Sequence, residues 1–488
     1  MTTTRRIIKN ASVVFLGDNV FKVLTVILIL FIARYLGVEE YGKFSFIISF
    51  TGLFFILMDL GTRILIVREI SQNKQNASRI ISNVFILKLF TSAIFYVIII
   101  AVSIFLDYDK EIIYGIAIAA LGIIFDSLAV TVGSVFQAFE RMEFPAYVKM
   151  GRILLRFAAT MPFLFAEQGF LPVLIIFVIM QFLNFLVCLL LSFKFFVKPV
   201  FDFDKKLIIY LIKKSFPFLL SGVFVTIYFR IDITLMSKIA PQIFEGIYSN
   251  ASREAVIGWY SAAYNILDGF ISIPTAISAA ILPVAITYFS ESKEKLKRIY
   301  TLSVKYLSYL SFPIAIGTTI IARSLILLVY NEEYLNSVLA LQLLVWTIVP
   351  LFINYMLGCV MIAIQREKEG MYILMGNAII NIILNLILIP KFSLYGAAVA
   401  TLLTELFYFS GYYYVISKHV GSINLFSILI KPFTASILMG VGLYFIREIN
   451  MFFLILIGAF TYLILMWAMK AFSEEDITLL KKIFKAKT

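Results

Sequence analysis

Leu171–Phe193, LPVLIIFVIMQFLNFLVCLLLSF, is a predominantly apolar run of 23 residues without a charged side chain. A helix rises 1.5 Å per residue, so this run is long enough to cross the roughly 30 Å hydrocarbon core of a bilayer. A strand of a membrane barrel would instead alternate apolar and polar residues over about ten positions. The stretch therefore predicts a transmembrane helix.

Runs of the same kind fill the chain, which has 488 residues, 61% of them hydrophobic and only 15% charged. Soluble domains have about 25% charged residues, so a protein of this composition has lipid as its solvent. We predict an all-α integral membrane fold with about 14 transmembrane helices. The predicted spans are 11–36, 42–70, 79–106, 112–139, 147–166, 171–197, 209–240, 255–289, 299–322, 338–364, 371–390, 394–416, 426–446 and 451–471.

The composition also excludes several classes of protein. Two cysteines and one histidine cannot make a disulfide framework or a Cys/His-rich zinc site. The spans leave no room for a soluble catalytic domain of ordinary size. Asp202-Phe203-Asp204 matches the D-x-D pattern of some glycosyltransferases, but it lies in a short lysine-rich linker without a nucleotide-binding fold around it. We expect a protein that is not an enzyme, needs no cofactor and binds no nucleic acid.

The net charge of +13 has an explanation in membrane topology. If every span crosses, one alternating set of loops and tails carries more basic residues than the other. For example, 290–298 carries Lys293, Lys295, Lys297 and Arg298, whereas Arg323 is the single basic residue of the opposite loop, 323–337. Basic loops stay on the cytoplasmic side. This asymmetry predicts a multi-pass protein of the cytoplasmic membrane with both termini in the cytoplasm.

The spans fall into two halves and a tail. We predict an amino-terminal lobe at 1–197, a cytoplasmic linker at 198–208, a carboxy-terminal lobe at 209–416 and two further spans within 417–471. Six plus six spans are typical of transporters built from repeats. The last segment, 472–488, has a helix-capping serine, acids and then lysines, which predicts an amphipathic helix on the cytoplasmic surface.

Ionisable residues inside spans mark the candidate site, because each costs at least about 2.5–3.5 kcal/mol at a helix centre unless it finds a partner. Asp18 with Lys22, and Asp59 with Arg63, have the i,i+4 spacing of direct ion pairs, which is the simplest structural explanation for them. Arg230 and Asp232 point in different directions, so they need different partners or a hydrated cavity. Asp126, Asp268 and Glu405 have no basic residue one turn away on the same helix. Lys88 is a further charge deep in its span.

Several segments carry a family resemblance. They are RYLGVEEYG (Arg34–Gly42), YFRIDITLMSKI around Asp232, VIGWYSAAYNI with the following IPTAISAAILPVAITYF, and NAIINIILNLILIPKFSLYGAAVATLLTE (Asn377–Glu405). Together they resemble the polysaccharide-transporter branch of the multidrug/oligosaccharidyl-lipid/polysaccharide (MOP) flippase superfamily, which includes O-antigen-repeat-unit flippases. The resemblance implies two six-helix lobes in a V, with helices 1, 2, 7 and 8 around a central cavity.

The resemblance also implies a function. The chain is expected to move an isoprenoid-(di)phosphate-linked oligosaccharide from the inner to the outer leaflet by alternating access, driven by Na⁺, H⁺ or the membrane potential, as a functional monomer among membrane lipids. The alternative is a cation-coupled multidrug exporter of the same superfamily. Expected substrate-binding residues are Lys22, Arg63, Lys88, Arg230 and Asp232. Candidates for the coupling ion are Asp18, Asp59, Asp126, Asp268 and Glu405.

Overall fold

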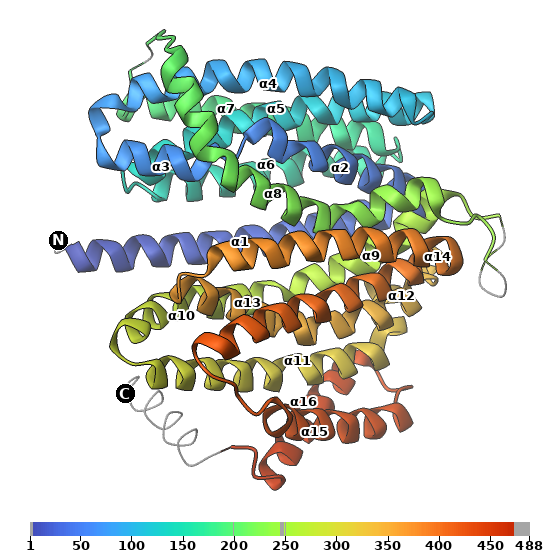
Figure 1. The fold of residues 1–488 in the computed structure, drawn as a ribbon. Helices are drawn as coiled ribbons and strands as arrows, with labels where there is room; N and C mark the ends of the chain where they lie inside the picture. Colours follow the sequence, from blue (N-terminus) through green and yellow to red (C-terminus); the bar gives the residue numbers. More distant parts are fainter. Residues whose placement is uncertain (1–2, 199, 245–247, 249, 473–488) are drawn as a thin grey trace. The chain divides into compact units, whose positions relative to one another are not determined.

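A computed structural model describes residues 3–198, 200–244, 248 and 250–472, with the backbone alone for residues 3–19. The side chain of Asp18 and the expected surface helix within 472–488 (from 473 onward) therefore lie outside the described residues. Within them, every regular element is a helix (Figure 1). The prediction of an all-α membrane fold is confirmed.

The longer helices follow the predicted spans closely. They are α1 (Thr3–Leu36), α2 (Val38–Asp59), α3 (Thr62–Gln72), α4 (Ala77–Phe105), α5 (Lys110–Ala138), α6 (Glu143–Phe165), α7 (Phe170–Phe195), α8 (Lys205–Ile239), α9 (Arg253–Phe270), α10 (Ser272–Glu291), α11 (Lys293–Val329), α12 (Ser337–Leu344), α13 (Ile348–Ala363), α14 (Glu367–His419), α15 (Leu425–Phe445) and α16 (Met451–Ala468).

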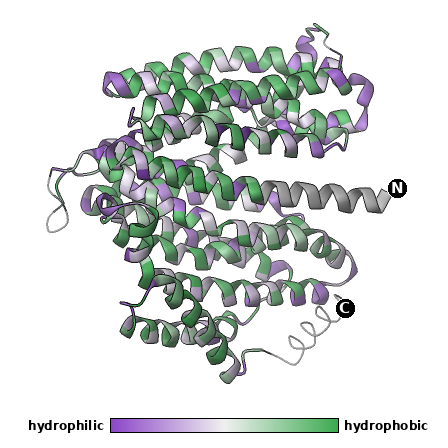
Figure 2. Ribbon diagram, turned by 180° about the vertical axis from the view of Figure 1, so that it is seen from behind, coloured by the Kyte–Doolittle hydropathy of each residue, from purple (hydrophilic) through white to green (hydrophobic). Residues whose placement is uncertain are grey.

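Eleven helical segments of the described residues are long and apolar enough to cross a membrane. Figure 2 shows that hydrophobic residues dominate the helices and that hydrophilic ones gather near their ends. One of the eleven, α14, contains two predicted spans. Ser393, with a φ of 53°, interrupts the helix between them. Helices α1 and α6 lie where two more spans are predicted, and α6 carries four charged residues, Glu143, Lys149, Arg152 and Arg156.

The chain divides into two compact units. Unit 1 comprises Met1–Asn265 and Leu374–Ala397, and unit 2 comprises Ile266–Ile373 and Ala398–Thr488. In unit 1, α5 packs against α2, α4 and α7. Gly122 of α5 leaves room for the Gln181 side chain of α7, since a Cβ atom there would lie 2.0 Å from Oε1 of Gln181.

In unit 2, α11 is the central helix and packs against α10, α13, α15 and α16. The last two helices join it through an apolar cluster that includes Met439, Leu443, Leu454, Tyr462 and Met466. The two spans that follow the predicted six-plus-six arrangement therefore belong to the packing of unit 2. The division of the chain into two six-span lobes itself stays a prediction.

The second predicted span, 42–70, is broken in its second half. Helix α2 ends at Asp59, Leu60 and Gly61 both have left-handed backbones with φ near 60°, and α3 begins at Thr62. Position 61 favours glycine for two reasons. Its φ is positive, and a Cβ atom there would lie 2.5 Å from the backbone nitrogen of Leu219. The break places Asp59 at the end of one helix and Arg63 in the next.

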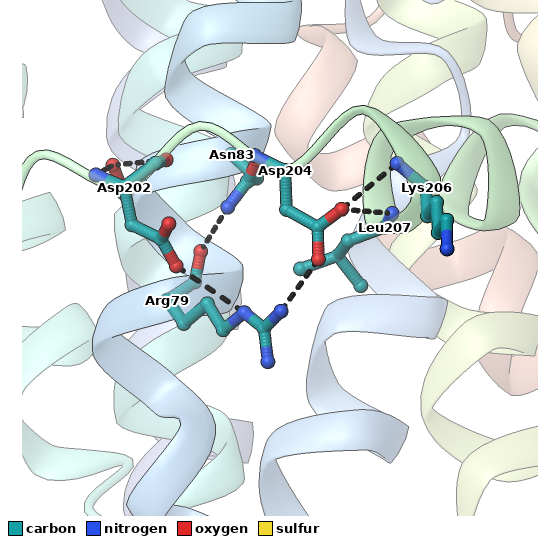
Figure 3. Close-up of polar contacts among 7 residues, drawn as sticks. Arg79, Asn83, Asp202, Asp204, Lys206 and Leu207 are labelled. Carbon is teal, nitrogen blue, oxygen red and sulfur yellow. Dashed lines mark hydrogen bonds and ion pairs between the residues drawn. The ribbon is translucent and has the colours of Figure 1, made fainter.

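The linker before α8 is bound to α4 by contacts of Arg79 with Asp202 and Asp204, which we call the clasp (Figure 3). Arg79 on α4 forms an ion pair with Asp202, with Nε 3.2 Å from Oδ2, and its Nη2 donates to Asp204 Oδ2 at 2.5 Å. Asp204 also caps α8, because its Oδ1 accepts the backbone N–H groups of Lys206 and Leu207. The D-x-D pattern thus holds the start of α8 next to α4.

Candidate functional site

Asp59 and Lys88 form a buried ion pair inside unit 1. Lys88 has no exposed surface and Asp59 is 5% exposed. Nζ of Lys88 donates to Asp59 Oδ1 at 2.6 Å and to the backbone oxygen of Ser127 at 3.0 Å. Asp59 therefore pairs across helices with Lys88, and the simpler explanation of an i,i+4 pair with Arg63 is wrong. Lys88 lines neither of the two unit 1 cavities described below.

A cavity that several charged side chains line lies among five helices of unit 1, and we call it the Arg152 cavity. Its volume is about 310 Å³. The lining side chains come from α2, α3, α5 and α7 and from the segment leading into and along α6. Its polar members are Arg63, Asp126, Gln137, Lys149, Arg152 and Asn184. Three cations thus face one carboxylate.

Asp126 has two partners in this cavity. Arg152 Nη1 donates to its Oδ1 at 3.3 Å, and Gln181 Nε2 donates to its Oδ2 at 2.9 Å. One turn beyond Arg152, Arg156 is 9% exposed and its guanidinium lies 4.0 Å from the ring centre of Phe177. The Nε atoms of both arginines are buried and have no hydrogen-bond partner among the described residues.

A second cavity of about 470 Å³ borders the break between α2 and α3, and we call it the Asp59 cavity. Asp59, Arg63 and Gln137 supply its ionisable and amide groups. Arg63 and Gln137 also line the Arg152 cavity. Arg63 lines both cavities because the break between α2 and α3 places it on a different helix from Asp59.

Arg230 and Asp232 on α8 have separate neighbours, as their spacing predicts. Asp232 is 3% exposed; Tyr260 donates its hydroxyl to Oδ2, and the backbone N–H of Ile233 donates to Oδ1. The Arg230 side chain lies against α2, where a Cβ atom on Gly52 would be 3.2 Å from its Nε. The two charges therefore do not form an ion pair with each other.

The remaining described candidates are not among the lining residues of either cavity. Lys22 on α1 and Asp268 on α9 are exposed. In unit 2, Glu405 is 3% exposed and accepts a hydrogen bond of 2.6 Å from the amide of Asn354. No cluster of three His, Cys, Asp or Glu side chains that could hold a metal ion occurs in the described part of the chain.

Our sequence reasoning missed the basic side chains of α6. Arg152 and Arg156 are inside the predicted span 147–166 and are four residues apart, so a signal was present. The spacing does not reveal the acid that Arg152 contacts, because Asp126 is 26 residues earlier in the chain. Only the packing of α5, α6 and α7 brings these groups together.

Unit 2 contains a cavity of a different character. Its volume is about 540 Å³, and α11, α15 and α16 supply most of its lining, which is largely apolar and includes Leu310, Ile314, Leu443, Leu454 and Ile455. A cavity of this kind suits an alkyl or isoprenoid chain better than a sugar, because burying a polar group without a hydrogen bond is unfavourable.

Comparison with known proteins gives a consistent result. The profile of the family described as polysaccharide biosynthesis protein matches residues 7–289. A probable flippase, AglR, of Haloferax volcanii is 28% identical over 158 residues, which are 31% of this chain and 32% of that protein. The match to this relative therefore spans about a third of its length.

Solved structures show the same fold at low identity. The lipid II flippase MurJ, in an inward closed conformation, superposes with a TM-score of 0.75 at 17% identity, covering 92% of this chain and 97% of MurJ. An inward-facing multidrug resistance transporter of the MATE family gives 0.57 at 14% identity, covering 87% and 95%. A MOP superfamily transporter from Pyrococcus furiosus gives 0.54 at 13%, covering 90% and 96%.

Proposed function

The chain belongs to the polysaccharide biosynthesis protein family, and from this membership we propose that it is a flippase. Its fold is that of multi-pass membrane transporters of the MOP superfamily. The proposed substrate is an isoprenoid-(di)phosphate-linked oligosaccharide, moved from the inner to the outer leaflet of the cytoplasmic membrane by alternating access. The match of the family profile to residues 7–289 is the observation that carries the proposal.

The physical problem of such a substrate is its polar head. Each polar group that enters hydrocarbon without a hydrogen bond costs several kcal/mol. The Arg152 and Asp59 cavities offer charged and amide side chains within helices proposed to span the membrane, and the apolar cavity of unit 2 is suited to a lipid chain. Lys22, Arg63, Arg230 and Asp232 are the proposed contacts of the head, whereas buried Lys88 supports them by holding the end of α2.

An ion gradient or the membrane potential would drive the cycle. Lys88 and Arg152 already neutralise Asp59 and Asp126. We therefore assign coupling by H⁺ or Na⁺ to the other acids among the candidates, Asp18, Asp268 and Glu405. Protonation of an acid within the membrane changes the charge that the protein must carry across the field, which is how a gradient can bias the cycle.

The proposal is tested in cells that lack the chromosomal copy of the gene and carry a plasmid copy. Arg230→Ala and Lys22→Ala are expected to abolish surface glycan while the protein accumulates normally in the membrane. Lys295→Ala, at an exposed pair with Glu291, is the control and should behave as wild type. Normal glycan output from both Arg230→Ala and Lys22→Ala would contradict the assigned roles.

The same strain separates flipping from drug export. The MATE-family structures share the fold, so export of cationic drugs is the second candidate. The match to the polysaccharide biosynthesis family favours the flippase over the exporter. We expect deletion to leave drug sensitivity unchanged and to accumulate lipid-linked oligosaccharide in the inner leaflet; drug hypersensitivity with normal glycan would instead favour the exporter.

A further inference from the structure

The apolar cavity of unit 2, which α11, α15 and α16 line, has a wall with few polar groups, and we call it the α16 cavity. Its lining includes no charged side chain of the described residues. Two of its polar side chains are Tyr309 and Tyr462. Their hydroxyls donate to the backbone oxygens of Ala471 at 2.7 Å and of Tyr309 at 2.9 Å. Because both donors are used within the protein, the wall offers a ligand mainly apolar surface.

The α16 cavity is open at the surface of the helices. Leu310 on α11, with Ile455 and Leu463 on α16, line it while 42%, 47% and 55% of their surface is exposed. Both helices are long and apolar enough to cross a membrane. Lipid tails are as apolar as leucine side chains, so a lipid chain can enter such a recess without a desolvation cost.

The dimensions of the α16 cavity match one acyl chain. Its lining residues on α11 run from Tyr309 to Ile321, about 18 Å at 1.5 Å per residue, and one leaflet of the hydrocarbon core is about 15 Å deep. The volume is about 540 Å³. A methylene group is similar in size to a water molecule, about 30 Å³, so the cavity holds roughly 18 carbon atoms. One phospholipid acyl chain has this size, whereas a long polyprenyl chain is several times larger.

Donors for a phosphate group lie at one end of the α16 cavity. Tyr309 and Phe472 line this end, and Lys470 is in the turn that follows α16. The ammonium of Lys431 on α15 donates to the backbone oxygen of Lys470 at 2.8 Å. An ammonium carries three N–H groups, so Lys431 can also donate to a phosphate, as can the exposed side chain of Lys470. The distribution of basic residues in the loops predicts that this end is cytoplasmic.

We propose that the α16 cavity binds a phospholipid of the inner leaflet, with one acyl chain in the recess and the phosphate at Lys431 and Lys470. This lipid is distinct from the lipid-linked substrate, because a long polyprenyl chain exceeds the volume of the cavity. The bound chain fills the space between α11 and α16 and thereby strengthens the attachment of the last two helices to unit 2. The proposal depends on the membrane fold alone, so it can fail independently of the flippase.

Gly317 allows the cavity to be filled without a clash. It lines the α16 cavity, and a Cβ atom on it would have no neighbouring atom within 4 Å. Gly317→Leu is expected to weaken the binding of palmitoyl-oleoyl-phosphatidylglycerol about tenfold or more, because the leucine takes the place of several methylenes of the lipid. Gly442→Leu on α15 is the matched control, since that position is equally open but does not line the cavity.

Binding is measured on the full-length protein in detergent micelles after lipid is removed. Native mass spectrometry and the melting temperature are followed while the same phosphatidylglycerol is added. The wild-type protein and Gly442→Leu should retain a phospholipid that Gly317→Leu loses, and should melt at a higher temperature with lipid than without it. Lys431→Gln and Lys470→Gln should each reduce the affinity several-fold. If Gly317→Leu does not fold, Ala459→Leu on the same lining replaces it, with the same expected loss.

Two results of this titration would overturn the proposal. The first is equal lipid binding by wild type and Gly317→Leu. The second is an equal loss in Gly442→Leu, which would mean that lipid covers the apolar surface in general and not this cavity.

Polyprenyl phosphate distinguishes the phospholipid from the lipid carrier. It is expected to leave the bound phospholipid in place and to change the melting temperatures of wild type and Gly317→Leu equally. Displacement of the phospholipid from wild type would assign the cavity to the carrier and overturn the proposal. In proteoliposomes, a wild-type protein that retains the phospholipid but does not flip lipid-linked oligosaccharide would refute the flippase and leave the phospholipid site standing.

Discussion

Lys88 shows at the residue scale how this protein accommodates a charge in the membrane. Its ammonium is fully buried, 2.6 Å from Asp59 and 3.0 Å from the Ser127 carbonyl. Arg63 cannot take that place. Leu60 and Gly61 have left-handed backbones, so the helix that would bring residues 59 and 63 onto one face is interrupted between them. The i,i+4 rule holds only within a continuous helix.

Removing one member of this pair should be strongly destabilising. Lys88→Met leaves the Asp59 carboxylate buried without its cation, and breaking a buried pair costs about 3–5 kcal/mol. We expect a decrease of that size in the free energy of unfolding, measured by denaturant titration in mixed micelles. The double variant Asp59→Asn/Lys88→Met should recover most of it, because neither buried charge remains.

The exposed pair of Glu291 and Lys295 is the matched control. It has the same 2.6 Å separation, but both side chains are about half exposed. Surface pairs of this type contribute about 0.3–0.5 kcal/mol. A loss in Lys88→Met no larger than that in Lys295→Met would show that the buried pair does not stabilise the unit.

At the scale of elements, the start of α8 is held by charge and by capping together. Backbone N–H groups of Leu207 and Lys206, with the Arg79 guanidinium, hold the pKa of Asp204 below its usual range. Asn83 accepts a further hydrogen bond from the Asp204 backbone. Four contacts thus connect the linker, α4 and α8 in one place (Figure 3).

This clasp should make the protein sensitive to acid. A carboxyl group whose pKa is lower in the folded state stabilises above its unfolded pKa of about 3.9 and loses that contribution as pH falls through the folded pKa. Asp204→Asn keeps a good cap but cannot be ionised. We expect its melting temperature to decrease less than that of wild type when the pH is lowered from 6 to 3.

Glu294→Gln provides the control for that measurement. Glu294 is another exposed acid near a capping serine, and it makes no contact with the linker. Between pH 6 and pH 3, the melting temperature of Glu294→Gln should decrease by more than that of Asp204→Asn. Parallel curves for wild type and Asp204→Asn would mean that the clasp contributes nothing to acid stability.

At the scale of the whole molecule, the loops determine the orientation in the membrane. Helix α11 has Lys293 at its start, and Glu332 follows its end; both side chains are exposed. The basic loop before α11 predicts that Lys293 is cytoplasmic and Glu332 is on the outer side.

Cysteine labelling tests that orientation. Lys293→Cys and Glu332→Cys are made separately after the two native cysteines, both buried, are replaced. A membrane-impermeant maleimide added to intact cells should label Glu332→Cys at once and Lys293→Cys only after permeabilisation. The reverse order would place both termini outside.

The sequence by itself determined that this is an all-α membrane protein, roughly where its helices run and to which family it is related. Those properties depend on apolar runs of spanning length and on local breaks, which can be recognised within a continuous stretch of sequence. Only the tertiary structure decided that Asp59 meets Lys88, that Asp126 meets Arg152 and Gln181, and that Arg63 reaches two cavities. These side chains come from different helices, and packing between helices selects the partner of a buried charge.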